Sequence, residues 1–209
     1  SIIFSNGKLK TVPEKLFANT KKVTTFNSLF ANTESFESVP DGLFANNPEV
    51  DSFRMLFSGT SLKSVPAGLF ANNHKVTNFQ SAFSKTAIQS VPADLFAGCG
   101  KVTTFMSCFT GCSELQSVPA ELFKSSGAFT TVTKTAFNNI FKDCTSLTEV
   151  PAGLFDGFTL VTAFNDAFNG CASLTTLPAG LFATNTAVTS FTNVFKDCTS
   201  LKSIPEGVL

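Results

Sequence analysis

The chain repeats one phrase eight times along its length, best written from residue 64 as SVPAGLF. Successive prolines of this phrase lie 27, 26, 26, 27, 32, 27 and 27 residues apart. A fixed period in the twenties is typical of a stacked solenoid, in which each repeat contacts mainly its neighbours. Because the repeat runs from end to end, we predict a single solenoid domain over residues 1–209, with both ends cut within repeats. The eight prolines are Pro13, Pro40, Pro66, Pro92, Pro119, Pro151, Pro178 and Pro205.

Twenty-two of the 25 Phe residues fall in three columns of the repeat. In the type repeat, residues 66–92, these columns are represented by Phe70, Phe79 and Phe83. Columns this regular predict that equivalent rings of consecutive repeats stack along the solenoid axis as a buried aromatic core. Full burial of one such ring is worth about 1.5–3 kcal/mol, and a well-oriented ring pair adds about 0.5–1.5 kcal/mol.

Spacing within the repeat predicts its local structure. Apolar residues at i, i+3 and i+4 over residues 77–83 predict a short helix, with Thr77 as its N-cap. Residues 66–70 fit one helical or 3₁₀ turn that starts at Pro66. Residues 61–65 predict a strand, which would pair with its equivalents in a parallel ladder at a spacing of about 4.8 Å. Whether the Val-Thr-x-Phe step is a second short strand stays open.

The motifs inside the repeat are specific enough to suggest a family. Residues 161–174, VTAFNDAFNGCASL, resemble the leucine-rich repeats of BspA-like bacterial surface proteins, and residues 141–147 and 195–201 repeat the second half of that motif. The resemblance implies a right-handed, leucine-rich-repeat-like α/β solenoid of about seven repeats of 26–27 residues, with a parallel strand ladder and short helices or 3₁₀ turns. It also implies a non-enzymatic bacterial protein, on the cell surface or secreted, associated with adhesion or recognition.

The charge balance and hydropathy exclude some partners. The chain has 15 Lys and Arg against 15 Asp and Glu, without a basic run, so we expect no nucleic-acid partner. No apolar stretch approaches the roughly 18 residues that a membrane helix needs, so we expect no direct membrane insertion. The sequence contains no Asn-x-Ser/Thr acceptor, which favours a bacterial origin over a eukaryotic secretory one.

Four of the six cysteines share one position, three residues after the third Phe column. Neighbouring repeats would place them close enough for disulfides, and a metal site is the other functional interpretation. Earlier repeats carry Thr33, Thr60 and Thr86 there, which favours a structural ladder of small side chains turned inward. No Cys-x-x-Cys occurs, so we expect no zinc site, and Cys99 fits no column. The predicted ladder consists of Cys112, Cys144, Cys171 and Cys198.

Catalytic chemistry has little support in the sequence. His74 is the sole histidine and lies in a turn, and the carboxylates are spread over different columns. No Gly-rich phosphate loop or paired acidic motif is present. We therefore predict no enzymatic activity and no catalytic, cofactor-binding or metal-binding residues.

Two places are candidates for recognition of a protein ligand on a host or neighbouring cell. The first is the polar position that follows the aliphatic residue before the Val-Pro step, which we expect to face solvent as an extended row. The second is a five-residue insertion within residues 124–134, because insertions in solenoids often lie on the binding face. A passive spacer and a glycan-binding module are the alternatives, although the absence of Tyr and Trp weakens the latter. The row is Lys10, Glu37, Lys63, Gln89, Gln116, Thr148, Thr175 and Lys202, and the candidate loop residues are Lys124, Ser125, Ser126, Phe129 and Thr130.

Overall fold

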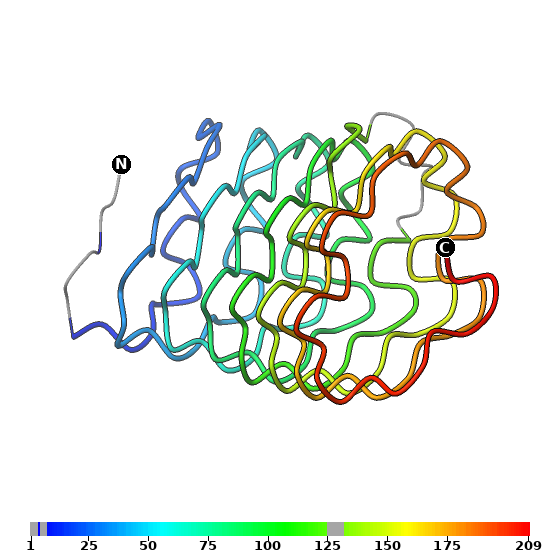
Figure 1. Cartoon of the computed structure of the whole chain (residues 1–209). Coiled ribbons are helices and arrows are strands. Elements are labelled where there is room, and N and C mark those ends of the chain that lie inside the picture. The colour runs from blue at the N-terminus through cyan, green and yellow to red at the C-terminus, as the bar shows by residue number, and fades with distance from the viewer. Residues whose placement is uncertain (1–3, 5–7, 125–131) are drawn as a thin grey trace.

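The computed structural model describes residue 4 and residues 8–124 and 132–209. The chain winds into a solenoid whose coils follow one another from the N-terminal to the C-terminal end (Figure 1). A coil is the stretch from one repeated proline to the next. Backbone hydrogen bonds join equivalent segments of neighbouring coils: the Phe53 amide donates to the Asn78 carbonyl at 3.0 Å, and the Phe79 amide to the Thr104 carbonyl at 3.1 Å. The predicted solenoid is therefore confirmed.

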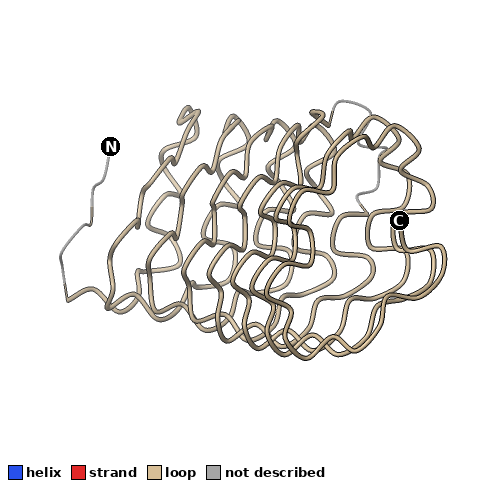
Figure 2. Cartoon of the chain, viewed as in Figure 1, coloured by secondary structure: helices blue, strands red, loops and turns tan. Residues whose placement is uncertain are grey.

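The described residues form no α-helix and no extended strand, and hydrogen-bonded turns alternate with short extended steps (Figure 2). Parallel pairing is limited to isolated bridges between equivalent residues of neighbouring coils. Most of these bridges lie in the Val-Thr-x-Phe step, so this step is the main ladder of the fold. The bridges join Thr25 to Ser52, Ser52 to Asn78, Asn78 to Thr104, Glu149 to Thr176, and Ala163 to Ser190.

The helix expected over residues 77–83 is wrong. The amides of Phe79, Ser81 and Phe83 donate to carbonyls of the next coil at 2.9–3.1 Å, and not to carbonyls four residues back. Ser81 has φ +55°, and this left-handed residue turns the chain so that both Phe side chains point inward, as a helical turn would place them. Thr77 Oγ1 donates to a carbonyl of the preceding coil at 3.2 Å, so it caps no helix.

Of the two geometries expected from sequence, the turn after Pro92 has the tighter one. The Leu95 amide donates to the Pro92 carbonyl at 3.2 Å and the Ala97 amide to the Asp94 carbonyl at 3.0 Å, which are the i to i−3 bonds of a 3₁₀ turn. Proline suits the first position of such a turn because its φ is already fixed near the required value. After Pro40, Pro66, Pro151 and Pro178, by contrast, a glycine two residues later has a φ of +63° to +73°.

The strand expected over residues 61–65 is reduced to one or two cross-coil hydrogen bonds between neighbouring coils. The Gln89 amide donates to the Lys63 carbonyl at 3.2 Å, and the Gln116 amide to the Gln89 carbonyl at 3.1 Å. The Val-Pro step follows directly, and proline has no amide hydrogen with which to continue the ladder. This explains why the pairing stops after one or two residues.

The aromatic core has the predicted columns. Rings of one column lie nearly parallel: Phe44 and Phe70 are 5.9 Å apart at 12°, and Phe70 and Phe96 are 6.4 Å apart at 1°. Rings of different columns are tilted, as between Phe70 and Phe79, whose centroids are 4.9 Å apart at 57°. Phe36, which replaces an aliphatic residue, is also fully buried and stacks on its neighbour Phe30 at 4.4 Å. The coils are therefore held in register by continuous stacks of rings.

In each coil, one residue between the second and third Phe columns and one residue two places after the third column adopt left-handed backbone, and the latter alternates in size. Asn32, Lys85 and Asp143 have φ near +58°, and glycine takes the same place in the coils that follow each of them. A Cβ added at Gly111 would lie 3.1 Å from the Lys85 side chain, so each long side chain lies over the glycine of the next coil. The full alternation is Asn32, Gly59, Lys85, Gly111, Asp143, Gly170 and Asp197.

Candidate functional site

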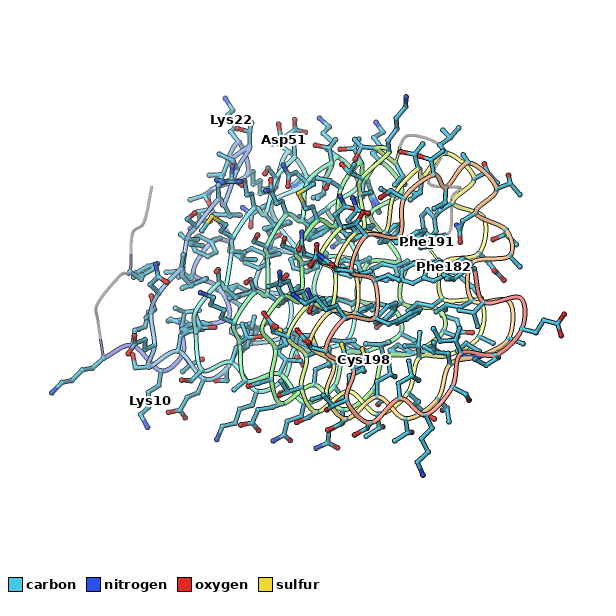
Figure 3. All side chains as sticks on the ribbon, viewed as in Figure 1. Lys10, Lys22, Asp51, Phe182, Phe191 and Cys198 are labelled. Carbon is cyan, nitrogen blue, oxygen red and sulfur yellow. The ribbon has the colours of Figure 1, made fainter. Side chains whose placement is uncertain are left out.

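The polar row predicted from sequence lies along one edge of the solenoid, at the bottom of Figure 3, where Lys10 is labelled. All eight side chains of the row are exposed. The carboxylate of Glu37 forms an ion pair with Lys10 at 3.2 Å, and the Thr175 hydroxyl donates to the Thr148 carbonyl at 3.3 Å. We call these eight residues the lower polar row. It is charged at its N-terminal end, hydroxyl-bearing at Thr148 and Thr175, and ends at Lys202.

A second exposed row runs directly beside the lower polar row and was missed in the sequence analysis. It occupies the position before each Val-Pro, Leu-Pro or Ile-Pro step, and it carries a hydroxyl in seven of its eight members. The hydroxyl residue that precedes nearly every Val-Pro step is the sequence signal that could have revealed this row. Together the two rows make the lower edge two residues wide on each coil. The second row is Thr11, Ser38, Ser64, Ser90, Ser117, Glu149, Thr176 and Ser203.

The main ladder also presents polar side chains. The sequence did not reveal this face, because its residues were assigned to a helix. Asn27 Oδ1 accepts hydrogen bonds from the Ser52 hydroxyl at 2.6 Å and from the Arg54 amide at 2.8 Å. Asn165 Oδ1 likewise accepts from the Ser190 hydroxyl at 2.6 Å. Side chains on this face therefore bridge neighbouring coils and fix the positions of one another.

One ion pair on the C-terminal part of this face is partly shielded from solvent. Lys142 Nζ lies 3.4 Å from Asp166 Oδ1, which also accepts a hydrogen bond from Asn169 Nδ2 at 2.6 Å. The hydrogen bond from Asn169, followed by the charge of Lys142, lowers the pKa of the Asp166 carboxyl below its ordinary value. The pair thus keeps its negative member ionised.

Most of the candidate insertion loop lies outside the described residues. Of its five candidate residues only Lys124 is described, and its side chain is exposed; Ser125, Ser126, Phe129 and Thr130 are not described. After this segment the Thr133 amide donates to the Thr103 carbonyl at 2.8 Å, which restores the ladder. Four residues, 133–136, then precede Phe137, where other coils have two, so this coil carries a bulge on the main ladder.

The four cysteines of the predicted ladder lie one above another with their thiols turned inward. All six cysteines of the chain are buried and none forms a disulfide. Each ladder thiol donates to the carbonyl of the third-column Phe in the preceding coil, as Cys144 does to Phe109 at 3.2 Å and Cys171 to Phe141 at 3.2 Å. Thr33 makes the equivalent bond to the Phe4 carbonyl at 2.7 Å. We call this file the thiol–hydroxyl ladder: Thr33, Thr60, Thr86, Cys112, Cys144, Cys171 and Cys198.

The thiols of this ladder are poor nucleophiles. Burial raises the pKa of Cys112 to about 11, against an opposing effect of its hydrogen bonds to Thr86. Burial also raises the pKa of Cys144, and the neighbouring thiols Cys112 and Cys171 raise it further. Since the thiolate is the reactive form of cysteine, these groups favour packing over redox or metal chemistry at neutral pH.

A second internal file was missed in the sequence analysis, and it contains the cysteine that fitted no column. Asn73 Nδ2 donates to the Phe44 carbonyl at 3.2 Å and to the Asn47 carbonyl at 2.9 Å. Cys99 takes the same place one coil later, with its thiol 3.7 Å from the Phe70 carbonyl. We call this file the asparagine ladder: Thr20, Asn47, Asn73, Cys99, Phe158 and Asn185. The expectation that Cys99 is irregular is therefore wrong.

The repeat matches a known family over almost its whole length. The model of the BspA-type leucine-rich repeat region matches residues 1–127 and 129–206, in six copies. The chain belongs to the BspA-type leucine-rich repeat family. This agrees with the resemblance seen in the Ala-Phe, Gly-Cys and Ser-Leu steps of the repeat. No curated protein matches the sequence.

One solved structure supports the leucine-rich repeat fold of this BspA-type chain. The APL1 leucine-rich repeat domain superposes with a TM-score of 0.50 at 15% identity, over 77% of this chain and 37% of that one. The leucine-rich repeat protein of T. pallidum aligns over 96% of this chain and 80% of its own, at 17% identity and a TM-score of 0.34. The chain thus spans little more than a third of the length of the first of these structures.

Leucine-rich repeat proteins commonly mediate protein–protein recognition, and their repeat domains are typically non-catalytic. Across the described residues of this BspA-type chain, no group of three or more His, Cys, Asp or Glu side chains could hold a metal ion. In that same part of the chain, no helix is long and apolar enough to cross a membrane. His74 is exposed in its turn, where Nδ1 lies 2.9 Å from the Gly98 carbonyl oxygen.

Proposed function

We propose that this chain is a non-enzymatic recognition and adhesion module of a bacterial surface or secreted protein, which binds a protein on a host or neighbouring cell. The observation that carries the proposal is the lower polar row, whose eight side chains are all exposed over consecutive coils. Membership of the BspA-type family supports the surface location, because that family is associated with bacterial surface proteins.

The side chains of the lower polar row are preorganised for binding. Buried ring stacks and cross-coil hydrogen bonds fix the backbone below the row, so its side chains need little ordering when a partner binds. Lower ordering costs raise affinity for the same contacts. Each coil offers one variable position on a constant frame, and the row therefore presents a specific pattern of charges and hydroxyls to a partner.

The test is a binding screen of the purified chain against immobilised host and bacterial surface proteins, read as saturable binding. The row variant carries Lys63→Glu and Lys202→Glu. Its matched control carries Lys15→Glu and Lys196→Glu, which change the net charge equally at exposed positions outside the row and the candidate loop. We expect the row variant to lose at least about tenfold in affinity, as for charges that face a partner, and the control to bind like the unaltered chain.

The other outcomes identify the rival functions. An absence of saturable binding to any protein would favour a passive spacer that carries other domains outward. Saturable binding confined to a glycan array would favour a glycan-binding module, which the paired hydroxyl rows of the lower edge would serve. Equal loss of binding in the row variant and its control would contradict the use of this row.

A further inference from the structure

A second charged edge lies opposite the lower polar row, at the top of Figure 3, where Lys22 and Asp51 are labelled. It is built from the turns that enter the main ladder. Backbone bonds stack these turns: the Asp51 amide donates to the Thr24 carbonyl and the Thr77 amide to the Asp51 carbonyl, each at 2.8 Å. Lysines of four different coils thereby gather on one edge. We call it the lysine edge: Lys21, Lys22, Lys75, Lys101 and Lys134, all exposed.

The lysine edge is basic although the chain has no net charge. Its carboxylates are Glu49, which pairs with Lys75 at 2.6 Å, and Asp51. Within the described part of the chain, Lys21, Lys22 and Lys101 form no ion pair. Acidic residues that offset these lysines lie on other faces, many of them in the turns after the prolines: Glu14, Asp41, Asp94, Glu121 and Glu206.

In the coil that starts at Pro151 the same edge carries one exposed apolar side chain. Leu160 occupies the position that Lys22, Lys75 and Lys101 occupy in earlier coils, and its side chain is 57% exposed. Thr159 precedes it and is also exposed. A large aliphatic side chain in water beside a row of lysines favours a partner that combines acidic groups with an apolar one.

We propose that the lysine edge binds an acidic, extended segment of a protein partner, which runs along the solenoid axis and places an apolar side chain on Leu160. This inference rests on the proposed function and names the chemistry of the partner. The edge from Lys22 to Leu160 spans five coil intervals, or about 28 Å at the 5.6 Å that separates stacked rings of neighbouring coils such as Phe30 and Phe57. An extended peptide covers about 3.3 Å per residue, so about nine residues reach across it.

Three features favour a peptide over a uniformly charged polyanion. Glu49 and Asp51 interrupt the lysines, and they would repel a chain that is negative at every position. Arginine, which grips sulfate and phosphate through two parallel hydrogen bonds, is absent from the edge; Arg54, the sole arginine, lies on the main ladder. The exposed apolar side chain of Leu160 would find no apolar surface to contact on a sulfated sugar or a nucleic-acid backbone.

The test uses a fluorescein-labelled peptide of about nine residues in which Glu and Gly alternate and Leu is last, read by anisotropy at low salt. The edge variant is K22E/K75E/K101E, and its matched control at exposed positions outside both the lysine edge and the lower polar row is K8E/K15E/K196E, with the same change of net charge. We expect the edge variant to bind at least about tenfold more weakly and the control to change by less than about twofold. Leu160→Asp tests the apolar end, with a smaller loss expected.

Several outcomes would overturn the inference. Equal loss in the two triple variants would show that only net charge matters, and absence of peptide binding to the unaltered chain would show that the edge is not a peptide site. Tighter binding of heparin or single-stranded DNA than of the peptide, lost in the edge variant, would assign the edge to a polyanion. If the peptide fails while a protein partner binds through the lower polar row, this inference falls and the proposed function stands.

Discussion

The two internal ladders of this solenoid satisfy the backbone in different ways. In the thiol–hydroxyl ladder each side chain offers one donor, such as the Cys144 thiol, and a Phe carbonyl takes it at 3.2 Å. In the asparagine ladder each Asn offers two donors to the preceding coil, yet its own oxygen has no partner: the Oδ1 atoms of Asn47, Asn73 and Asn185 are buried and accept no hydrogen bond. The thiol–hydroxyl ladder therefore tolerates exchange of Thr for Cys, because each side chain has a single donor and that donor is used. An Asn in the asparagine ladder contributes a second hydrogen bond, but at the cost of a buried oxygen without a donor.

The largest expected effect comes from the ring stacks that lie between the two ladders. Phe70→Ala removes a ring that contacts Phe44, Phe53, Phe79 and Phe96. We expect a loss of about 3–5 kcal/mol in the free energy of unfolding, because a large cavity would open in a rigid stack. Denaturant unfolding measures it, with Leu160→Ala as the exposed control, expected to change stability by less than about 0.5 kcal/mol. A loss below about 1 kcal/mol at Phe70 would contradict the stacked core.

The next effect tests the asparagine ladder directly. Asn73→Ala removes the side-chain hydrogen bonds to the Phe44 and Asn47 carbonyls, each of which keeps one backbone amide donor. Because a hydrogen bond contributes about 0.5–1.5 kcal/mol net, we expect the loss of two to lower the free energy of unfolding by about 1–3 kcal/mol. Asn73→Cys copies the residue that Cys99 supplies one coil later, keeps a weak donor and removes the unpaired oxygen. It should therefore cost less than Asn73→Ala when the two are compared by denaturant unfolding. A greater loss for Cys than for Ala would mean that the unpaired oxygen is itself stabilising.

A smaller effect of opposite sign is expected at the left-handed positions. Lys85 has φ +57°, which costs a residue with a Cβ roughly 1 kcal/mol. Lys85→Gly should therefore raise the free energy of unfolding by about 0.5–1 kcal/mol, as seen in a shift of the denaturant midpoint. Gly111→Ala is the matched test one coil later. It should lower stability, because its φ is +72° and the new Cβ would meet the Lys85 side chain. Changes of the same sign at both positions would contradict the alternation.

The smallest expected effect concerns chemical labelling of the buried thiols and involves no change of stability. In the folded chain, iodoacetamide should fail to label the buried cysteines at pH 8, whereas all six should react in denaturant. The pKa values of about 11 for Cys112 and about 12 for Cys99 mean that the thiolate population, and with it the labelling rate, keeps rising past pH 9. Mass spectrometry of the labelled chain measures this. Rapid labelling of folded Cys112 at pH 8 would show that the ladder opens to solvent.

The solenoid and the ring stacks could be predicted from the sequence, because both depend on a regular repeat length and on Phe side chains that recur at fixed positions and are buried. It failed at residues 77–83, where a helix and a turn with a left-handed Ser81 place the same apolar residues inward. The i, i+3, i+4 spacing cannot tell these two geometries apart.

The asparagine ladder was invisible for a different reason. Its members are Thr, Asn, Cys and Phe, which share no hydropathy and are united only by the carbonyls that they face. The lysine edge escaped detection because its residues are dispersed in the sequence and meet only through stacking of the turns. Patterns of burial can be read from a single sequence, but patterns that arise between coils require the register of one coil on the next.

The absence of helices and extended strands among the described residues has a consequence for how this molecule would look in solution (Figure 2). Far-ultraviolet circular dichroism depends on repeated backbone dihedral angles, which irregular turns do not provide. Many backbone amides of this protein nevertheless donate hydrogen bonds to carbonyls of neighbouring coils, with N···O distances of 2.7–3.3 Å. These amide hydrogens should therefore exchange slowly with deuterated water. An observer with a dichroism spectrum alone would take this protein for a random coil, and an observer with an exchange experiment would find it rigid.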